Sequence, residues 1–420
     1  MLPVDAVPAA VMEVVRGLRA GGFAAFLVGG CVRDLLRKAK PEDFDLATSA
    51  RPEQVQKLFK RVIPTGIEHG TVTVVVGKEH VEVTTFRAEA DYVDGRRPSK
   101  VEFHEDIEAD LGRRDFTMNA IAWEPTANVL VDPFHGQEDL AAKTIRAVRV
   151  PLERFLEDGL RPLRAVRFAT VLDFNIEPET EAAITKTLHV FRKVATERIQ
   201  QEFVKLLLAP VAPKGLELLQ RTGLLAEFLP EANTSHFEAV GRAPKDESIR
   251  LAVLLQGVPK ARDVVMRLKF PSKVADEAGA LAAEITLPAI DTTDADLRRW
   301  LSRITAARAA PLFEVHEAIK PTDGSFRRRV ETLLATNPPL TAKALALDGK
   351  GIMDALRTGP SPVVGQATRY LLEAVLEDPT KNSPEGLKAL LSAFPQGFPH
   401  ATPRNDPPLP SEDGSARKKS

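Results

Sequence analysis

The sequence predicts an α+β fold, in which a mixed-sheet domain occupies the N-terminal part of the chain and helices make up the remainder. An apolar run over 23–28 ends in two glycines and is followed by apolar spacing that suits a short helix. Two runs rich in valine and threonine, 71–76 and 81–87, flank a turn with a glycine and predict a β-hairpin. From about residue 145 the pattern is helical almost throughout.

Length and composition bound the class of protein. The chain has 420 residues, enough for two to four domains. Lys and Arg number 57 against 58 Asp and Glu, so a nucleic-acid partner would need a local basic surface. The single cysteine, Cys31, excludes an internal disulfide and is predicted to be a packing residue rather than a nucleophile. With no signal sequence and no apolar run of about 20 residues, we expect a cytoplasmic protein that does not span a membrane.

The first elements are predicted from apolar spacing and glycines. Residues 8–20 carry apolar side chains at helical spacing and stop at a glycine pair, which predicts a helix over one face of the sheet. After the strand at 23–28, Gly29 and Gly30 let backbone N–H groups approach an anion, and the helix that follows adds a favourable dipole. Arg33 falls in the first turn of that helix, where a phosphate would arrive.

Two aspartates follow this strand, turn and helix. Asp43 and Asp45 flank Phe44 in a predicted short strand, in which residues i and i+2 point to the same face. Two convergent carboxylates repel one another unless a cation lies between them, and hard oxygen ligands beside a triphosphate suit Mg²⁺. A lone Asp-x-Asp is also typical of turns and caps, but the preceding Gly-Gly-x-x-Arg-Asp favours a metal site.

Further candidates lie along the next strands and loops. Glu82 shares a strand face with Thr84 and Phe86 and is a candidate third carboxylate, although an outward-facing Glu on a half-exposed strand accounts for the same pattern. Residues 91–100 are polar, basic and punctuated by Gly and Pro, which predicts a mobile loop. Residues 110–122 begin with charge and predict a helix with apolar side chains facing the core.

Five blocks, taken in order, carry a resemblance to a known family. They are Leu-Val-Gly-Gly-Cys-Val-Arg-Asp at 27–34 with Asp43-x-Asp45, Pro-Thr-Gly-Ile-Glu-His-Gly-Thr-Val-Thr at 64–73, Arg-Arg-Asp-Phe-Thr-Met-Asn at 113–119, Glu-Asp-Gly-Leu-Arg-Pro-Leu-Arg-Ala-Val-Arg-Phe at 157–168 and Glu-Arg-Ile-Gln-Gln-Glu at 197–202. Together they resemble the class II tRNA nucleotidyltransferase and bacterial poly(A) polymerase family. The resemblance covers about the first half of the chain, and the second half matches more loosely.

The resemblance implies a polymerase-β-like nucleotidyltransferase head followed by helical regions. The predicted parts are a catalytic head at 1–144, a neck with a nucleobase-reading helix at 145–210, a body at 211–325, a tRNA-binding tail at 326–397 and a disordered C-terminus at 398–420. The loop at 91–100 is implied to serve addition of the terminal adenosine, which argues against an enzyme that adds only CC. Gln256-Gly257 stands where many relatives have His-Asp, so a phosphohydrolase activity is not expected.

Residue chemistry and the resemblance together define the predicted site. The catalytic residues are Asp43 and Asp45, which would also hold the metal, with Glu82 as the candidate third carboxylate. The nucleotide-binding residues are Gly29, Gly30, Arg33, Asp34, Arg114, Asp115, Asn119, Asp158, Arg161, Arg164 and Arg167. Arg114 suits a phosphate and Asp115 a ribose hydroxyl, because a guanidinium only donates and a carboxylate accepts; a surface ion pair is the alternative.

Asp158 and Arg161 are the predicted base-reading pair. Cytosine and adenine each present an amino donor beside a ring-nitrogen acceptor, so an Asp acceptor next to an Arg donor selects these two bases together. An ordinary ion pair between residues i and i+3 is the alternative, and Pro162 is expected to kink the helix at Arg161. Glu197, Arg198 and Glu202 are predicted to brace the neck.

The predicted reaction is addition of CCA to a tRNA 3′ end from CTP and ATP, without a nucleic-acid template and with two Mg²⁺ ions. An enzyme that adds only A is the close alternative. A poly(A) polymerase is less favoured, because the segment from Thr65 resembles the tRNA-type signature. The alternative from another class is an RNA-binding protein with an inactive head, which should lack Asp43 or Asp45; both are present. The oligomeric state stays open.

Overall fold

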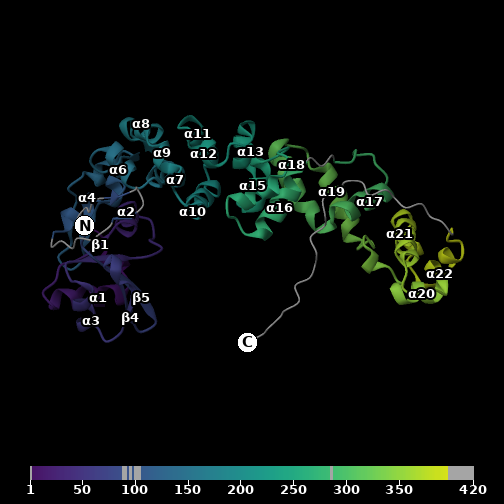
Figure 1. The fold of residues 1–420 in the computed structure, drawn as a ribbon, viewed down its shortest axis with the longest axis horizontal. Coiled ribbons are helices and arrows are strands. Elements are labelled where there is room, and N and C mark those ends of the chain that lie inside the picture. The colour runs from purple at the N-terminus through teal and green to yellow at the C-terminus, as the bar shows by residue number, and fades with distance from the viewer. Residues whose placement is uncertain (1, 88–91, 94–96, 99–105, 284–286, 396–420) are drawn as a thin grey trace. The chain divides into compact units, whose positions relative to one another are not determined.

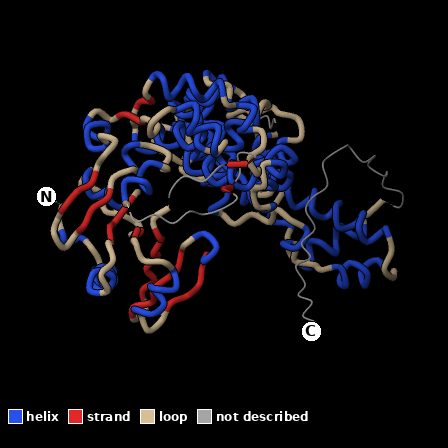
Figure 2. Tube along the Cα trace, turned by 60° about the vertical axis from the view of Figure 1, so that its left-hand side comes forward, coloured by secondary structure: helices blue, strands red, loops and turns tan. Residues whose placement is uncertain are grey.

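The computed structural model describes residues 2–87, 92–93, 97–98, 106–283 and 287–395 of the chain. The chain forms two compact units: one comprises residues 1–285 with 311–321, and the other residues 286–310 with 322–420. The longer strands lie in the N-terminal part of the first unit (Figure 1), and helices dominate elsewhere in the described chain, as Figure 2 shows by colour. The predicted α+β fold class is confirmed.

Within the described residues, seven strands form a mixed sheet in the order β3-β4-β5-β2-β1-β8-β9. β2 runs parallel to β5, whereas β1 is antiparallel to β2 and β8. The antiparallel pair β4 and β5 confirms the predicted hairpin. The strands are β1 (Ala25–Val28), β2 (Asp45–Thr48), β3 (Val62–Gly66), β4 (Thr71–Val76), β5 (Glu79–Thr85), β8 (Ala122–Glu124) and β9 (Val129–Val131). Shorter pairs join β6 (Tyr92–Val93) to β7 (Arg97–Pro98) and β10 (Thr144–Ile145) to β11 (Asn175–Ile176).

The two faces of this sheet are covered differently. Helix α1 (Ala9–Ala20) contacts β1, β4 and β5, and its Val14, Val15 and Leu18 are fully buried, which confirms the helix predicted at 8–20. On the other face a buried cluster contains Phe86 of the chain after β5, Val28 of β1 and Leu111, with the other members Ala47, Ile107, Ala120, Ala122 and Val148. This second cluster lies next to the strand ends that carry the predicted site.

The helix predicted at 110–122 is wrong, although its apolar side chains are core residues as expected. Helix α4 (Ile107–Gly112) ends before Arg113, and a 3-10 turn and strand β8 follow. Phe116 is extended and bridges to Ala147, and its N–H donates to the Asp115 carboxylate at 2.9 Å. Pairing of β8 with β1 and this bridge satisfy the backbone better than a continued helix, because both lie in the buried core.

The rest of the first unit is helical. Its remaining helices are α2 (Gly30–Leu36), α3 (Pro52–Leu58), α5 (Gly136–Ala141), α6 (Pro151–Glu157), α7 (Arg161–Leu172), α8 (Pro178–Lys186), α9 (Leu188–Phe191), α10 (Thr196–Leu207), α11 (Ala212–Arg221), α12 (Leu224–Phe228), α13 (Phe237–Arg242), α14 (Glu247–Leu254), α15 (Ala261–Arg267) and α16 (Ser272–Ala282), with residues 311–319 of α18 (Ala309–Ile319). Pro162 lies in the first turn of α7, so the chain breaks between α6 and α7 instead of kinking one helix.

The second unit has a core of its own. Its full helices are α17 (Asp294–Ile304), α19 (Ser325–Ala335), α20 (Gly349–Leu356), α21 (Pro362–Glu377) and α22 (Pro384–Ser392). Ile352, Leu371 and Leu387 are buried together where α20, α21 and α22 meet. Arg298 of α17 donates to the carbonyl oxygen of Leu376 at 2.6 Å, which ties α17 to the end of α21.

The division into head, neck, body and tail stays a prediction. Of the loop predicted at 91–100, only 92–93 and 97–98 lie within the described residues, where they pair as β6 and β7. The C-terminus predicted at 398–420 lies outside the described residues.

Candidate functional site

The glycine turn after β1 is built around the side chain of Arg114. Gly29 has a φ of 73°, a conformation that L side chains rarely adopt. A Cβ added to Gly29 would lie 2.9 Å from Nη1 of Arg114, so the guanidinium fills the space that a side chain would need. Gly30 then begins α2. Two segments that were predicted to bind the same phosphates therefore meet at this turn.

Arg33 on α2 is held by two partners. Its Nε and Nη2 each donate to the Asp34 carboxylate at 2.9 Å, and its Nη1 donates to Oδ1 of Asn119 at 3.0 Å. This fork geometry fixes the guanidinium plane, because two parallel bonds remove its rotation. Three predicted nucleotide-binding residues thus form one connected group.

The predicted catalytic carboxylates lie at the start of β2 and on the neighbouring strand β5. Strand β2 begins at Asp45, and Asp43 precedes it in the loop, so only one of the two belongs to the strand. In the parallel pair of β2 and β5, Leu46 lies opposite Val83, and Asp45 and Glu82 stand one residue before them. All three acidic residues are exposed. They are thereby available to a ligand that arrives from solvent.

Asp45 lies in an electrostatic environment that opposes its charge. Although the side chain reaches solvent, the surrounding protein and the nearby Asp43 and Glu82 carboxylates raise the pKa of Asp45 to about 6, against an opposing effect of Arg114. A cation bound there would relieve the repulsion and favour the ionised form.

The donor set fits a magnesium ion. In the described part of the chain no group of three or more His, Cys, Asp and Glu side chains is arranged to hold a metal. Two carboxylates are nevertheless sufficient for Mg²⁺, which binds proteins through one or two carboxylates and completes its coordination with water and substrate phosphates. Asp43 and Asp45 meet that requirement, and Glu82 stays a candidate.

Asp115 is the centre of a buried network. Its Oδ1 accepts from the N–H of Phe116 and from Nδ2 of Asn119, and its Oδ2 accepts from Nε of Arg164 at 2.9 Å. Burial alone would raise its pKa, but Arg164, Asn119 and Arg161 outweigh burial and hold the pKa of Asp115 at about 2. The carboxylate therefore stays ionised and fixed in place.

The network continues into helices α7 and α10. Glu202 of α10 accepts from Nη1 of Arg164 at 3.2 Å and from Nε of Arg167 at 2.8 Å, and it is 6% exposed. The Phe168 ring lies beneath the guanidinium groups of Arg33, Arg164 and Arg167, which are 5.3, 5.4 and 3.4 Å from its centroid. Sequence reasoning gave Glu202 a bracing role, and both Glu202 and Phe168 contact predicted site residues.

Asp158 and Arg161 do not form a side-chain ion pair with each other. Asp158 follows the end of α6, accepts from the N–H of Leu160 and pairs with Arg198 at 2.9 Å. Arg161 donates to Glu157 at 2.8 Å and to the carbonyl oxygens of Arg154 and Arg113. The ordinary i and i+3 ion pair is therefore not formed, and Arg161 uses three of its five N–H groups.

Sequence reasoning missed Asp110 and Glu157. Asp110 is 1% exposed and accepts from both Arg113 and Arg114. The spacing held a signal, because residues three and four apart are neighbours on a helix surface. Glu157 precedes Asp158 directly and binds Arg161 at the i to i+4 spacing. Asp110 and Glu157 thus bind the side chains of predicted site residues, Arg114 and Arg161.

The prediction that Cys31 is a packing residue is confirmed. Its side chain is 2% exposed and its Sγ donates to the carbonyl oxygen of Val28 at 3.3 Å. Burial raises the pKa of the thiol to about 11, so it is protonated at neutral pH.

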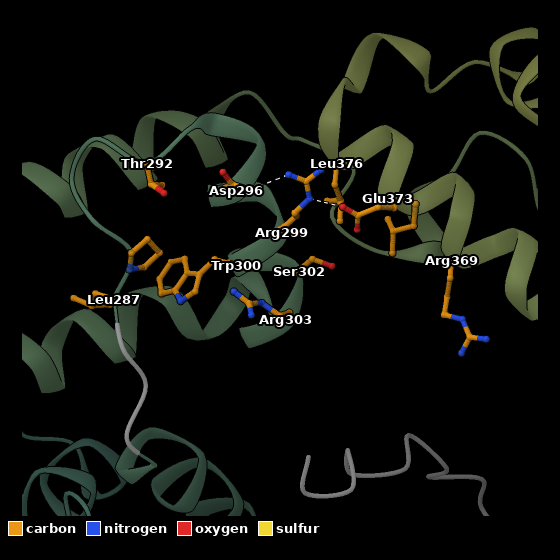
Figure 3. A pocket seen from close by; sticks show the side chains of 12 residues that line it. Leu287, Thr292, Asp296, Arg299, Trp300, Ser302, Arg303, Arg369, Glu373 and Leu376 are labelled. Carbon is orange, nitrogen blue, oxygen red and sulfur yellow. Dashed lines mark hydrogen bonds and ion pairs between the residues drawn. The ribbon is translucent and has the colours of Figure 1, made fainter. Parts of the chain in front are cut away.

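An open cavity of about 700 Å³ lies between α17 and α21 of the second unit (Figure 3). Arg299 of α17 donates to Asp296 on the same helix and bridges to α21 by donating to Glu373. Trp300 and the exposed Arg303 and Arg369 also line the cavity. None of the predicted site residues lines it.

Two family profiles match the chain. The poly A polymerase head domain matches residues 25–146, and the probable RNA and SrmB-binding site of polymerase A matches residues 173–235.

In the described residues no helix combines the length and apolar character that crossing a bilayer requires.

Individual relatives match over nearly the whole chain. A CCA-adding enzyme of Geobacillus stearothermophilus is 37% identical over 408 residues, covering 90% of this chain and 95% of that protein. One of Streptococcus sanguinis is 36% identical over 395 residues, with 90% and 96% covered. The crystal structure of Bacillus stearothermophilus CCA-adding enzyme in complex with CTP superposes with a TM-score of 0.78 at 33% identity and covers 94% of this chain and 98% of that one.

Proposed function

Since this chain belongs to the family of CCA-adding enzymes, which are tRNA nucleotidyltransferases, we propose that it adds CCA to the 3′ end of tRNA from CTP and ATP without a nucleic-acid template. The observation that carries the proposal within this chain is the exposed Asp43 and Asp45 pair, which lies near Glu82 and within electrostatic reach of Arg114. Charged groups of both signs thus converge where a triphosphate and its metal would bind.

The chemistry of each side chain determines its role in the proposed reaction. Asp43 and Asp45, with Glu82 as a candidate third, would hold Mg²⁺, which when bound supplies a Lewis acid for the primer hydroxyl and the triphosphate. Arg33 and Arg114 bind the phosphates because guanidinium groups present paired donors to phosphate oxygens. Asp115 accepts a hydrogen bond from the ribose, and its network with Asn119 and Arg164 positions it for that contact.

Base selection falls to Asp158 and Arg161. Arg161 keeps two N–H groups beyond its three bonds to the protein, and those bonds fix the direction of the guanidinium. Asp158 supplies the acceptor for the amino group that cytosine and adenine share. In this scheme residues 1–144 are the catalytic head, 145–210 the neck that reads the base, 211–325 the body and 326–397 the part that binds tRNA.

The test uses three tRNA transcripts, which end before the CCA sequence, after CC and after CCA. Purified protein is incubated with Mg²⁺ and labelled CTP or ATP, separately and together. The proposal expects the shortest transcript to gain C, C and A and then to stop, and an Asp43→Ala protein to incorporate no label. Addition of a single A only to the CC-ended transcript would instead identify an A-adding enzyme, long A tails a poly(A) polymerase, and no incorporation an RNA-binding protein.

A further inference from the structure

Asp110 of α4 is a buried acid that no step of the proposed reaction uses. It is 1% exposed, and two of the residues that bind it, Arg113 and Arg114, lead into the site. Its Oδ1 accepts from Nε and Nη2 of Arg113 at 2.9 and 2.6 Å, and its Oδ2 accepts from Nη2 of Arg114 at 3.1 Å. The N–H of Arg87, just beyond β5, approaches the same Oδ1 at 3.3 Å.

Arg114 is the residue through which Asp110 reaches the site. While Nη2 of Arg114 binds Asp110, its Nη1 lies against the Gly29 turn and donates to the carbonyl oxygen of Asn119 at 3.5 Å. A rotation of this guanidinium would change the space beside the phosphate turn, because Nη1 lies 2.9 Å from where a Cβ at Gly29 would stand.

Arg113 gives Asp110 a second connection. The carbonyl oxygen of Arg113 accepts from Nη2 of Arg161 at 2.9 Å, and the carbonyl oxygen of neighbouring Gly112 accepts from Nη1 of Arg154 at 3.1 Å. By fixing the Arg113 side chain, the same carboxylate fixes the backbone on which the base-reading arginine rests. Asp110 is thus connected to the phosphate-binding group through Arg114 and to the base-reading group through Arg113.

We propose that Asp110 is a positioning residue for nucleotide binding, which holds the Arg114 guanidinium against the Gly29 turn. The inference rests on the proposed function. Asp110 itself touches no substrate. Its carboxylate sets where Arg114 points, and Asn in its place would offer an amide N–H to a guanidinium that needs an acceptor.

The experiment compares Asp110→Asn with Glu124→Gln in steady-state CCA addition. Glu124 is a matched control, because it is 4% exposed in the same sheet domain and accepts from the Thr126 and Ala127 backbone, outside the site network. For Asp110→Asn the KM for CTP should rise on the order of tenfold at saturating tRNA, with the KM for tRNA unchanged, whereas Glu124→Gln should keep the wild-type KM for CTP. A purely structural role would lower stability without separating these two KM values.

A double-mutant cycle identifies the route. If Asp110 acts through Arg114, Asp110→Asn adds no further rise in the KM for CTP to an Arg114→Ala protein. An equal KM for CTP in Asp110→Asn and Glu124→Gln, or an additive effect in the double variant, overturns the inference. Should Asp110→Asn fail to fold, Asp110→Glu is judged by the same criteria. A wild-type protein that adds no CCA refutes the proposed function, whereas an active wild type with a normal Asp110→Asn refutes only this inference.

Discussion

The cluster of Asp43, Asp45 and Glu82 and the network around Asp115 and Glu202 are both rich in charge. Only the network pairs its acids with arginines. Asp43, Asp45 and Glu82 are exposed acids, and desolvation by the surrounding protein, together with repulsion from Asp43 and Glu82, raises the pKa of Asp45 to about 6. In the network, Asp115 and Glu202 are buried acids that are paired with arginines, and the pKa of Asp115 is held at about 2.

The contrast indicates two different roles for the acidic residues. Acids that lie mainly among other acids are costly to ionise and gain most from a metal, so they mark the place of the proposed chemistry. Acids that are paired with arginines gain little from a further cation, but they fix the direction of the arginines around them. The first group should therefore control activity, and the second should control stability and geometry.

Removing one exposed carboxylate should have the largest effect on activity. Asp45→Asn is expected to lower the rate of CCA addition by at least about a thousandfold, because a metal ligand is lost. Its midpoint of thermal unfolding should not fall, since ionisation of Asp45 is unfavourable in the folded protein. Glu42→Gln, an exposed neighbour outside the pair, is the control and should keep near-wild-type activity. Rate measurements and thermal unfolding of both variants make the check.

Removing one buried acid should, in contrast, mainly lower the stability of the protein. Glu202→Ala leaves Arg164 and Arg167 without a shared partner and should lower the free energy of unfolding by about 3 kcal/mol. Glu181→Ala, which breaks a surface pair with Arg221, should cost less than about 1 kcal/mol. Denaturant unfolding of the two variants measures the difference. Equal losses would show that the network is not a stabilising unit.

The network should also give stability a defined pH dependence. The pKa of Asp115 is about 2 in the folded protein, below its ordinary 3.8, so its contribution is present above about pH 4 and is lost as pH falls through about 2. That contribution is about 2 kcal/mol at neutral pH. Asp115→Asn should flatten this part of the stability profile. Unfolding can be followed through the buried Trp123 in a Trp300→Phe background, and an unchanged profile would contradict the pairing.

The smallest effect is expected at the turn where the two regions meet. Gly29→Ala and Gly22→Ala both place a side chain at positive φ, 73° and 85°, and each should cost roughly 1 kcal/mol of stability. Only at Gly29 does the new Cβ meet a site residue, Arg114, whereas at Gly22 nothing lies within 4 Å. Calorimetric titration with CTP should therefore find weaker binding for Gly29→Ala alone. Equal affinities would separate the turn from nucleotide binding.

Predictions from local pattern were accurate where the pattern itself specifies the structure. Alternation over 71–87 gave the β4 and β5 hairpin, and helical spacing gave α1. The segment at 110–122 was mispredicted because its backbone pairs with distant partners, Phe116 with Ala147 and Ala122 with Val28. Local propensity cannot report such pairing, which forms only when the sheet assembles.

The sequence by itself determined the kinds of groups and the short spacings that place them: two glycines before Arg33, two aspartates one residue apart, and arginines three residues apart on a helix. These follow from local sterics and periodicity, which act within a few residues. Only the tertiary structure decided which charges are balanced. Arg33 meets Asn119 across 86 positions and Arg164 meets Asp115 across 49, and Asp110 binds Arg114 with its carboxylate buried by the packing around it. In a chain with 57 basic and 58 acidic residues, burial selects the pairs, since only buried groups must find partners within the protein.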